Sequence, residues 1–383
     1  MTKLTRHRYI ASAVKSDLVD KMVFIGGPRQ VGKTTLALHL IGAERGGAHP
    51  SYLNWDIPSH RRRILHEELP SEGDTLVFDE IHKFARWRSF MKGFYDRYYP
   101  GRKAIVTGSA RLDYYRKGGD SLQGRTRYFR LHPYSLRELN ARPTPADLDL
   151  LLRFGGFPEP LSKGSEKHWR RWQRDRIDRV MEADLRSLER VHEMSLLELL
   201  ADALPERVGS PLSIQNLRGD LEVSHDSVRR WLDIFERLYL CFRLSPYGPP
   251  RIRAVKKEQK LYLWDWSAVP EGGTRFENLV ASHLLKYCHF LEDTEGYRMD
   301  LRYLRDTDKR EVDFVVLEGK KPLFAVECKT GEREVSPNAR YFRARTPIPQ
   351  FYQVHLGTRD YGDAERDVRV LPFWKFAQEM KLP

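Results

Sequence analysis

Residues 22–35 of this 383-residue chain read MVFIGGPRQVGKTT, and this stretch decides the fold. It opens with the apolar run MVFI (22–25), which predicts a short buried strand. Two glycines end the strand, and residues 27–34 match the pattern G-x-x-x-x-G-K-[ST]. The apolar run at 35–41 then has helical spacing. A strand, a glycine loop and a helix in this order predict a phosphate-binding loop.

The glycine loop predicts a nucleotide site built mainly from backbone groups. Its glycines let consecutive N–H groups curl around the phosphates, and the following helix adds the partial positive charge of its N-terminus. Lys33 would supply a point charge to the phosphates, and the Thr34 hydroxyl would coordinate Mg²⁺. A glycine turn with an unrelated lysine is the alternative, which the coincidence of all these parts disfavours. The predicted binding set is Gly27, Pro28, Arg29, Gln30, Val31, Gly32, Lys33, Thr34 and Thr35.

A second apolar run, TLVFDE at 75–80, ends in two carboxylates and is similar to a Walker B segment. Asp79 would hold Mg²⁺ through water, and Glu80 would orient and deprotonate the attacking water. Adjacent acids are common on protein surfaces. Their position along the sequence, in the next part of the chain after a glycine loop, favours the catalytic interpretation. A further strand at 103–109 ends at Ser109, which we expect either to contact the γ-phosphate or the attacking water, or to cap a helix.

The composition indicates a globular protein with an acidic partner. A length of 383 residues allows two or three domains, and the net charge of +13 favours nucleic acid, although a solvated basic surface remains an alternative. Three distant cysteines form no C-x-x-C pair, which fits a reducing compartment and argues against a zinc site or a disulfide framework. The N-terminus has no apolar leader, and no run approaches 18 apolar residues. We therefore expect a cytoplasmic protein without a membrane segment.

Several stretches together resemble one family. GPRQVGKTT, LVFDEIHK, VTGSAR, GRTRYFRLHPYSLREL and GGFPEP look like the prokaryotic AAA+ ATPases whose C-terminal half is known only as a domain of unknown function. The resemblance covers nearly the whole chain and implies a P-loop sheet with an additional strand, ATP hydrolysis and Mg²⁺. It also implies a homo-oligomer, because AAA+ sites generally take an arginine from the neighbouring subunit. Arg125 is the candidate for that arginine, with an ordinary surface arginine as the alternative.

The pattern of strands and helices predicts an α/β protein with three domains. Strands alternating with helices in residues 1–165 indicate a parallel sheet covered on both faces, the AAA+ P-loop domain. Residues 166–270 predict a helical linker followed by a winged helix-turn-helix. The expected elements of that module are helices at 213–221 and 226–239 and strands at 240–244 and 260–264. Its arginines Arg229, Arg230 and Arg237 would contact phosphates, or the module would bind another protein.

Residues 271–383 carry a second set of candidate catalytic groups. Asp313 lies in one predicted strand and Glu327-x-Lys329 in the next, so the two carboxylates and the lysine can meet on a hairpin. Such a group can hold Mg²⁺ and polarise water for attack on a phosphodiester, and Glu277 on the preceding helix could add a third metal ligand. The alternative is an ordinary solvated hairpin.

The same residues resemble the PD-(D/E)XK core of restriction endonucleases and junction resolvases, with Val312 in place of the usual proline. This resemblance implies a restriction-endonuclease-like α/β domain. The whole chain is then predicted to be an ATP-hydrolysing enzyme that acts on DNA independently of sequence, branched DNA included, with Mg²⁺-dependent cleavage. The competing prediction is a regulatory switch, in which ATP sets the oligomeric state and the nuclease-like domain only binds DNA or protein.

Overall fold

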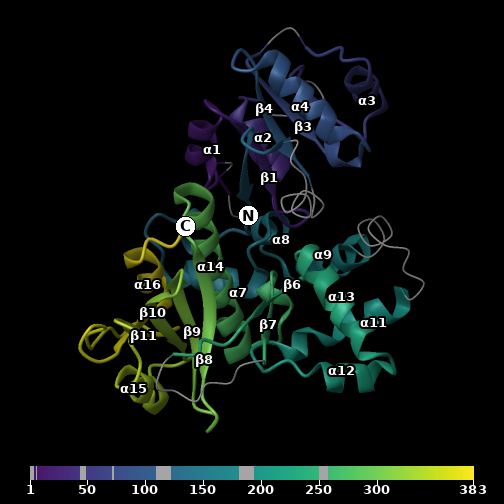
Figure 1. Cartoon of the computed structure of the whole chain (residues 1–383). Coiled ribbons are helices and arrows are strands. Elements are labelled where there is room, and N and C mark those ends of the chain that lie inside the picture. Colours follow the sequence, from purple (N-terminus) through teal and green to yellow (C-terminus); the bar gives the residue numbers. More distant parts are fainter. Residues whose placement is uncertain are drawn as a thin grey trace. The chain divides into compact units, whose positions relative to one another are not determined.

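The structure is a computed structural model (Figure 1), and it describes residues 4–5, 7–43, 49–70, 73–108, 122–180, 194–249 and 258–383. The chain forms two compact units. Leu4–His132 and Asp293–Glu295 make the first, which we call the P-loop unit, and Pro133–Glu292 with Gly296–Pro383 make the second, the C-terminal unit. No helix in the described ranges combines the length and the apolar composition that crossing a membrane requires.

The described part of the P-loop unit contains a five-stranded parallel sheet with the order β2-β3-β4-β1-β5. Its strands are β1 (Met22–Gly26), β2 (Tyr52–Asn54), β3 (Thr75–Asp79), β4 (Lys103–Thr107) and β5 (Thr126–Arg130). Strand β4 lies between the P-loop strand β1 and the strand β3 that ends in Asp79. The parallel α/β sheet predicted from the sequence is therefore confirmed, and β4 is the additional strand.

Helices cover both faces of this sheet. They are α1 (Ala11–Asp17), α2 (Lys33–Leu40), α3 (Pro58–Leu65), a short 3₁₀ turn at Ile81–Lys83, and α4 (Trp87–Tyr98). On one face Phe24 and Phe78 pack against the rings of Trp87 and Phe94 from α4. Burial of a side chain the size of Phe78, which is fully enclosed, contributes about 1.5–3 kcal/mol. Helices α1 and α2 pack on the sheet as well, which explains why β1 is apolar along its whole length.

The helical part of the C-terminal unit begins directly after the P-loop unit. Its helices are α6 (Leu136–Leu139), α7 (Pro145–Phe154), α8 (Pro158–Lys163), α9 (Glu166–Arg179), α11 (Met194–Ala203), a 3₁₀ turn (Pro205–Arg207), α12 (Ile214–Leu221) and α13 (His225–Arg237). A three-residue turn, 222–224, joins α12 to α13. The antiparallel strands β6 (Cys241–Leu244) and β7 (Lys260–Leu263) follow, and Val208 bridges to Leu261 beside them. This order of elements matches the one expected for the middle of the chain; its assignment as a winged helix stays a prediction.

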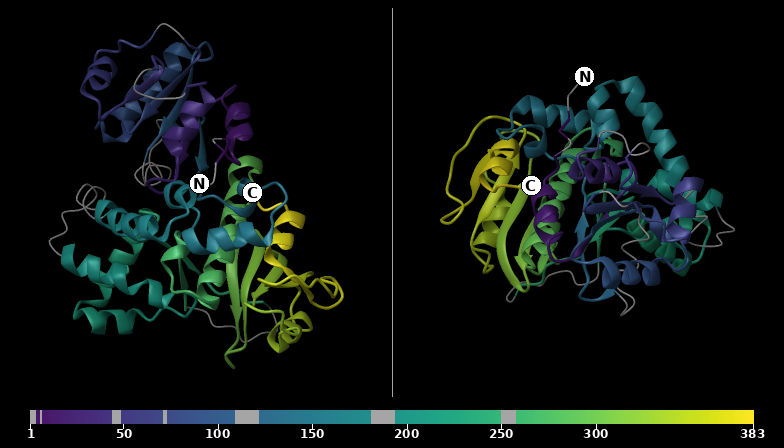
Figure 2. Two further views of the ribbon diagram at one scale, coloured as in Figure 1. Left: turned by 180° about the vertical axis from the view of Figure 1, so that it is seen from behind. Right: turned by 90° about the horizontal axis from the view of Figure 1, so that it is seen from above.

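The C-terminal sheet is mixed and has the order β12-β11-β10-β9-β8. Its strands are β8 (Met299–Arg305), β9 (Glu311–Glu318), β10 (Lys321–Cys328), β11 (Phe351–His355) and β12 (Arg369–Pro372), and its helices are α14 (Gly273–Glu295), α15 (Pro337–Arg343), α16 (Phe373–Glu379) and the 3₁₀ turn Trp266–Ala268. Strands β8, β9 and β10 are antiparallel, whereas β10, β11 and β12 are parallel. The long helix α14 runs along the sheet (Figures 1 and 2), and α15 packs on β9 through Phe342.

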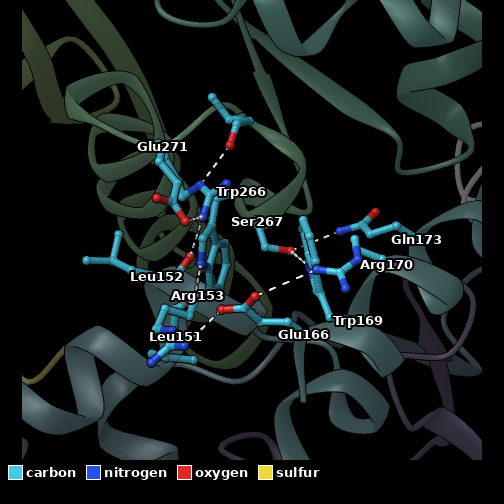
Figure 3. A network of polar contacts seen from close by, with 12 residues as sticks. Leu151, Leu152, Arg153, Glu166, Trp169, Arg170, Gln173, Trp266, Ser267 and Glu271 are labelled. Atoms are coloured by element: carbon cyan, nitrogen blue, oxygen red, sulfur yellow. Dashed lines mark hydrogen bonds and ion pairs between the residues drawn. The ribbon is translucent and has the colours of Figure 1, made fainter. Parts of the chain in front are cut away.

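The boundary between the units lies at His132, whereas the sequence analysis placed the end of the ATPase domain at residue 165. The intervening segment packs on residues 265–267 instead (Figure 3). The Trp266 indole donates to the Leu151 carbonyl at 2.7 Å, and Trp169 donates to the Ser267 hydroxyl at 2.9 Å. Gly156 permits this contact, because an added Cβ would lie 2.5 Å from the Tyr134 carbonyl oxygen.

Replacement of Gly156 by alanine should therefore destabilise the C-terminal unit by about 1–3 kcal/mol, since the added carbon meets backbone and the buried Trp266 ring at 2.6 Å. Gly219→Ala is the matched control, because in α12 an added Cβ meets no atom within 4 Å and should stabilise by about 0.5–1 kcal/mol. Denaturant unfolding of both variants measures the difference. Equal stabilities would show that the contact at Gly156 has no energetic weight.

Candidate functional site

The glycine loop adopts a backbone conformation that requires glycine at two of its positions. Gly27 has a φ of 137°, and a Cβ there would lie 2.4 Å from the Leu131 carbonyl oxygen. Gly32 caps the N-terminus of α2 with a φ of 101°. Both positions therefore require glycine, and the strand-loop-helix order predicted for residues 22–41 is present. The loop ends where the first N–H groups of α2 and its partial positive charge lie.

Lys33 lies across the loop that precedes it. Its side chain is buried, and its ammonium donates to the carbonyl oxygens of Gly27 at 2.9 Å and Pro28 at 2.7 Å. The positive charge is thus held against the loop, at the start of α2. A site with this charge and these backbone donors suits an anionic group such as a phosphate.

Asp79 joins the loop to three neighbouring strands. One carboxylate oxygen, Oδ2, accepts from the Thr34 hydroxyl at 2.9 Å and from the Tyr52 hydroxyl at 2.6 Å. The other, Oδ1, accepts from Thr107 at 2.6 Å. Asn54 and Thr107 are the register partners of Asp79 in β2 and β4, so the carboxyl ends of these parallel strands meet at one edge. Burial and the charge of Asp79 raise the pKa of Tyr52 well above its ordinary value.

The donor set at Asp79 fits Mg²⁺. Thr34 and Asp79 offer a hydroxyl and a carboxylate oxygen, and their separation of 2.9 Å brings the two predicted motifs together. Oxygen donors of this kind are the ones that Mg²⁺ prefers, and an ion bound there would neutralise phosphate charge. The predicted roles of Thr34 and Asp79 as metal ligands remain predictions.

Glu80 is held in an environment that strengthens it as a base. It has a φ of 54°, an uncommon conformation for a residue with a side chain. Within the described residues its buried Oε2 accepts no hydrogen bond, and the Lys83 ammonium lies 3.4 Å away. Burial and the charge of Asp79 raise the pKa of Glu80, while Lys83, Lys33 and Arg29 oppose the rise. A carboxylate with a raised pKa takes a proton from water more readily.

Arg8 is a residue of this site that sequence reasoning missed. Its guanidinium is 2% exposed and donates to the carbonyl oxygens of Val31 at 2.9 Å and His132 at 2.6 Å. It therefore connects the glycine loop to the last residue before the C-terminal unit. No motif marks it, because a single arginine in a basic N-terminal segment looks like a surface residue.

Arg125, the predicted arginine of a neighbouring site, lies elsewhere in the P-loop unit. Arg125 pairs with Asp96 at 2.8 Å and precedes β5, where Thr126 is level with Met22 at the start of β1. It is therefore at the opposite edge of the sheet from the loop of its own chain. Its action on a neighbouring subunit stays a prediction. Ser109 lies outside the described residues.

The C-terminal unit brings Asp313, Glu327 and Lys329 together where β9 and β10 pair. Asp313 accepts from the backbone N–H of Cys328 at 2.7 Å, and Lys329 pairs with Glu327 at 2.6 Å. Phe314 and Val326 are register partners, so the two carboxylates lie across the antiparallel pair from each other. Burial raises the pKa of Glu327, and the charge of Asp313 adds to this rise. The predicted meeting of these side chains on one hairpin matches the structure.

Glu277 on α14 belongs to the same group of side chains. Its contacts with Tyr262 and Lys260 were not predicted from the sequence. Its Oε1 accepts from the Tyr262 hydroxyl at 2.7 Å and lies 3.6 Å from the Lys260 ammonium. Lys260 also pairs with Glu311 of β9, and only 1% of its surface is exposed. Sequence reasoning placed Lys260 in a strand of the wing and gave it no chemical role. We call this group the carboxylate pocket: Lys260, Tyr262, Glu277, Glu311, Asp313, Glu327 and Lys329.

The metal-binding role predicted for Glu277, Asp313 and Glu327 in the carboxylate pocket stays a prediction. Among the residues that the structure describes, no group of three or more His, Cys, Asp or Glu side chains is placed to hold one metal ion. Burial raises the pKa of Glu277, and the charge of Asp313 raises it further. Glu277, Asp313 and Glu327 are thus close enough to repel one another, but Mg²⁺ does not fit them as a ready set of three ligands.

Comparison with protein families finds a match for each of three parts of the chain. A family model described as an AAA domain matches residues 19–140. Two further models, both described as domains of unknown function (DUF8612 and DUF4143), match residues 145–270 and 272–376. The P-loop, Asp79 and Glu80 all lie within the first match, so this part of the chain is similar to an AAA domain.

The relatives with similar sequences are distant. An uncharacterized protein of Mycobacterium tuberculosis is 24% identical over 246 residues, which are 64% of this chain and 54% of that protein. The chain thus spans about half the length of that relative. An uncharacterized protein of Methanocaldococcus jannaschii is 22% identical over 379 residues, covering 82% of this chain and 76% of its own.

A solved structure, the ORC1 protein of Aeropyrum pernix in complex with DNA, is 13% identical and has a TM-score of 0.35. The match covers 72% of this chain and 92% of that one. This likeness is too low to support an argument about function, and the assignment of the AAA domain rests on the family model and the sheet.

Arg8→Ala should weaken nucleotide binding about tenfold or more, because a hydrogen bond from a charged donor is worth about 1.5–3 kcal/mol and two of them hold the loop here. Arg8→Lys should lose less, since one ammonium can keep one of the two carbonyl partners. Titration with a fluorescent ATP analogue measures both. Arg62→Ala, an exposed change on α3, is the control and should bind as the unaltered chain does. Unchanged binding in Arg8→Ala would remove Arg8 from the site.

Proposed function

We propose that the chain binds ATP and hydrolyses it at the P-loop. The observation that carries this proposal is the 2.9 Å hydrogen bond from the Thr34 hydroxyl to Asp79. It joins the loop to the strand end 45 residues further on, which is the arrangement that nucleotide hydrolysis by P-loop enzymes needs. The match of residues 19–140 to an AAA domain supports the same function.

Each residue of the site then has a chemical role. The ammonium of Lys33 moves from the loop carbonyls to the phosphates, whose charge it balances. Thr34 and Asp79 hold Mg²⁺, which supplies charge neutralisation when bound. Glu80 takes the proton of the attacking water, a role for which its burial prepares it. Tyr52 and Thr107 keep the Asp79 carboxylate in position.

We also propose that the protein acts on DNA as a homo-oligomer. The net charge of +13 favours an acidic polymer as partner. In α13, which follows a three-residue turn, Arg229 and Arg230 are exposed, and Arg237 adds a third positive charge at its end. Contacts of this kind go to phosphates and would give binding independent of sequence, to branched as well as linear DNA. In the oligomer Arg125 would exchange Asp96 for the nucleotide of a neighbour.

For the C-terminal domain the structure favours the second of the two predicted functions. The meeting of Asp313, Glu327 and Lys329 supports a nuclease-like fold. Glu277, the predicted third metal ligand, already accepts a hydrogen bond from Tyr262 and faces the Lys260 ammonium. We therefore propose that this domain binds DNA or protein under the control of ATP and leaves phosphodiesters intact.

Lys33→Ala should abolish ATP binding, whereas Glu80→Gln should bind ATP and hydrolyse it about 10²–10⁴-fold more slowly. The results differ because Lys33 balances phosphate charge in the bound state and Glu80 acts on water in the transition state. Phosphate release measured beside equilibrium binding separates the two. Glu68→Gln, exposed and distant from the loop, should behave as the unaltered chain. Hydrolysis at the unaltered rate by Glu80→Gln would falsify the assignment of the base.

DNA binding should weaken steeply with salt, because each phosphate contact releases counterions and lowers the log–log slope by about 0.9. The double variant Arg229→Ala/Arg230→Ala should therefore bind more weakly and lose about two units of slope. Fluorescence anisotropy of labelled linear and branched DNA at rising salt measures this. Lys320→Ala, in the exposed turn between β9 and β10, is the matched control. An unchanged slope in the double variant would place the DNA on another surface.

A further inference from the structure

We propose that the ammonium of Lys260 holds the position of a divalent cation in the carboxylate pocket, so that the pocket is assembled around an internal cation and not around a metal. The inference concerns only the C-terminal unit and does not depend on ATP hydrolysis. It extends the proposed binding role of that unit by naming the residue that keeps a metal out.

Lys260 is in contact with acidic groups from two different elements. It pairs with Glu311 on β9, and its ammonium lies 3.6 Å from Oε1 of Glu277 on α14. The ring of Tyr303, with its centroid 5.5 Å from the ammonium, covers another side. A lysine that is only 1% exposed needs such partners, because burying an unpaired ammonium is very costly.

The backbone on both sides of Lys260 is anchored, so the ammonium cannot swing away easily. Lys260 pairs with Leu244 in β6 and forms a bridge with Pro211 on its other edge. The preceding residue, Gln259, accepts from the Leu212 N–H at 2.7 Å, and the Glu258 carbonyl accepts from the Tyr303 hydroxyl at 2.8 Å. The ammonium of Lys260, on β7, is thus held among acids that come from residues 277–327.

Cationic side chains of the chain itself face the acids of the pocket. Burial raises the pKa of Asp313, and Lys260 is the group that most opposes this rise, ahead of Lys329. Lys260 is also the main opposing group at Glu277. Arg305 pairs with Glu311 at 3.0 Å, and Lys329 with Glu327 at 2.6 Å. Repulsion between buried carboxylates is the usual reason for a metal at such a place, and these cations reduce it.

Glu277 is also unsuited to serve as a third metal ligand. Its Oε1 already accepts from Tyr262 at 2.7 Å and faces Lys260. The backbone at Gly209 closes in on the same carboxylate, because a Cβ there would lie 3.2 Å from Oε1. A metal at Glu277 would have to displace the ammonium. Removal of that ammonium should therefore open the position to a divalent ion.

The test uses Mn²⁺ as the probe and the full chain carrying Thr34→Ala, without nucleotide, so that the metal position proposed at Thr34 and Asp79 does not contribute. Electron paramagnetic resonance of free Mn²⁺ counts the bound ions. Without a further change the chain should bind no Mn²⁺ at concentrations up to about 1 mM, the weak end of oxygen-ligand sites. Lys260→Met, which keeps the length and removes the charge, should bind one Mn²⁺ per chain at about 10⁻⁴–10⁻³ M. Its melting temperature should fall and should rise again with Mn²⁺.

Two controls identify where the ion binds. Lys321→Met, an exposed lysine at the start of β10, should bind no Mn²⁺. Adding Asp313→Asn to Lys260→Met should remove the gained ion. The proposal is overturned if the chain with native Lys260 binds one Mn²⁺ that Asp313→Asn removes, or if folded Lys260→Met binds none. Should Lys260→Met fail to fold, the melting temperature of the chain with Lys260 decides alone: no shift with Mn²⁺ supports the proposal, and a shift that Asp313→Asn removes contradicts it.

Discussion

Asp79 is 4% exposed, and a carboxylate so far from water must be hydrogen bonded within the protein. Its partners Thr34, Tyr52 and Thr107 come from the helix after the loop and from the strands on either side of β3. The nucleotide site proposed for the P-loop unit therefore lies where the ends of three strands meet the start of one helix. Loss of Asp79 would remove the acceptor of two buried hydroxyl groups, Tyr52 and Thr107, and of the half-buried Thr34, and would disturb the loop and the sheet together.

The C-terminal unit depends on the same constraint, that a buried charged group needs a partner within the protein. Its buried groups are lysines and arginines. Lys286 on α14 pairs with Glu138, and Arg176 on α9 lies 3.9 Å from Asp265. Both pairs join residues that are far apart in sequence, and they tie the segment after His132 to α14 and to the turn at 265–267. Buried pairs add little net stability, but breaking one is costly, so they specify which elements pack together.

The two sites differ in how their charges were placed. The P-loop unit keeps Glu80 short of hydrogen bonds and close to cations, an arrangement that leaves it free for chemistry. In the carboxylate pocket Lys260 faces Glu277 and Lys329 pairs with Glu327 through one carboxylate oxygen, while the buried Oε2 of Glu327 accepts no hydrogen bond among the described residues. The difference between the two sites therefore lies in the buried lysine, Lys260, which faces acids of the carboxylate pocket directly.

The sequence by itself determined the nucleotide loop, because the positive φ at Gly32 and the groups of Lys33 and Thr34 all lie within a few residues of one another. It also predicted the parallel sheet and the hairpin that carries Asp313 and Glu327, since both follow from local periodicity. Only the tertiary structure decided the boundary at His132, the hydroxyl groups around Asp79, and the place of Lys260 beside Glu311. Lys260 and Glu311 are 51 residues apart, and what brings them together is the order of strands and the need of a buried charge for a partner, neither of which a local pattern contains.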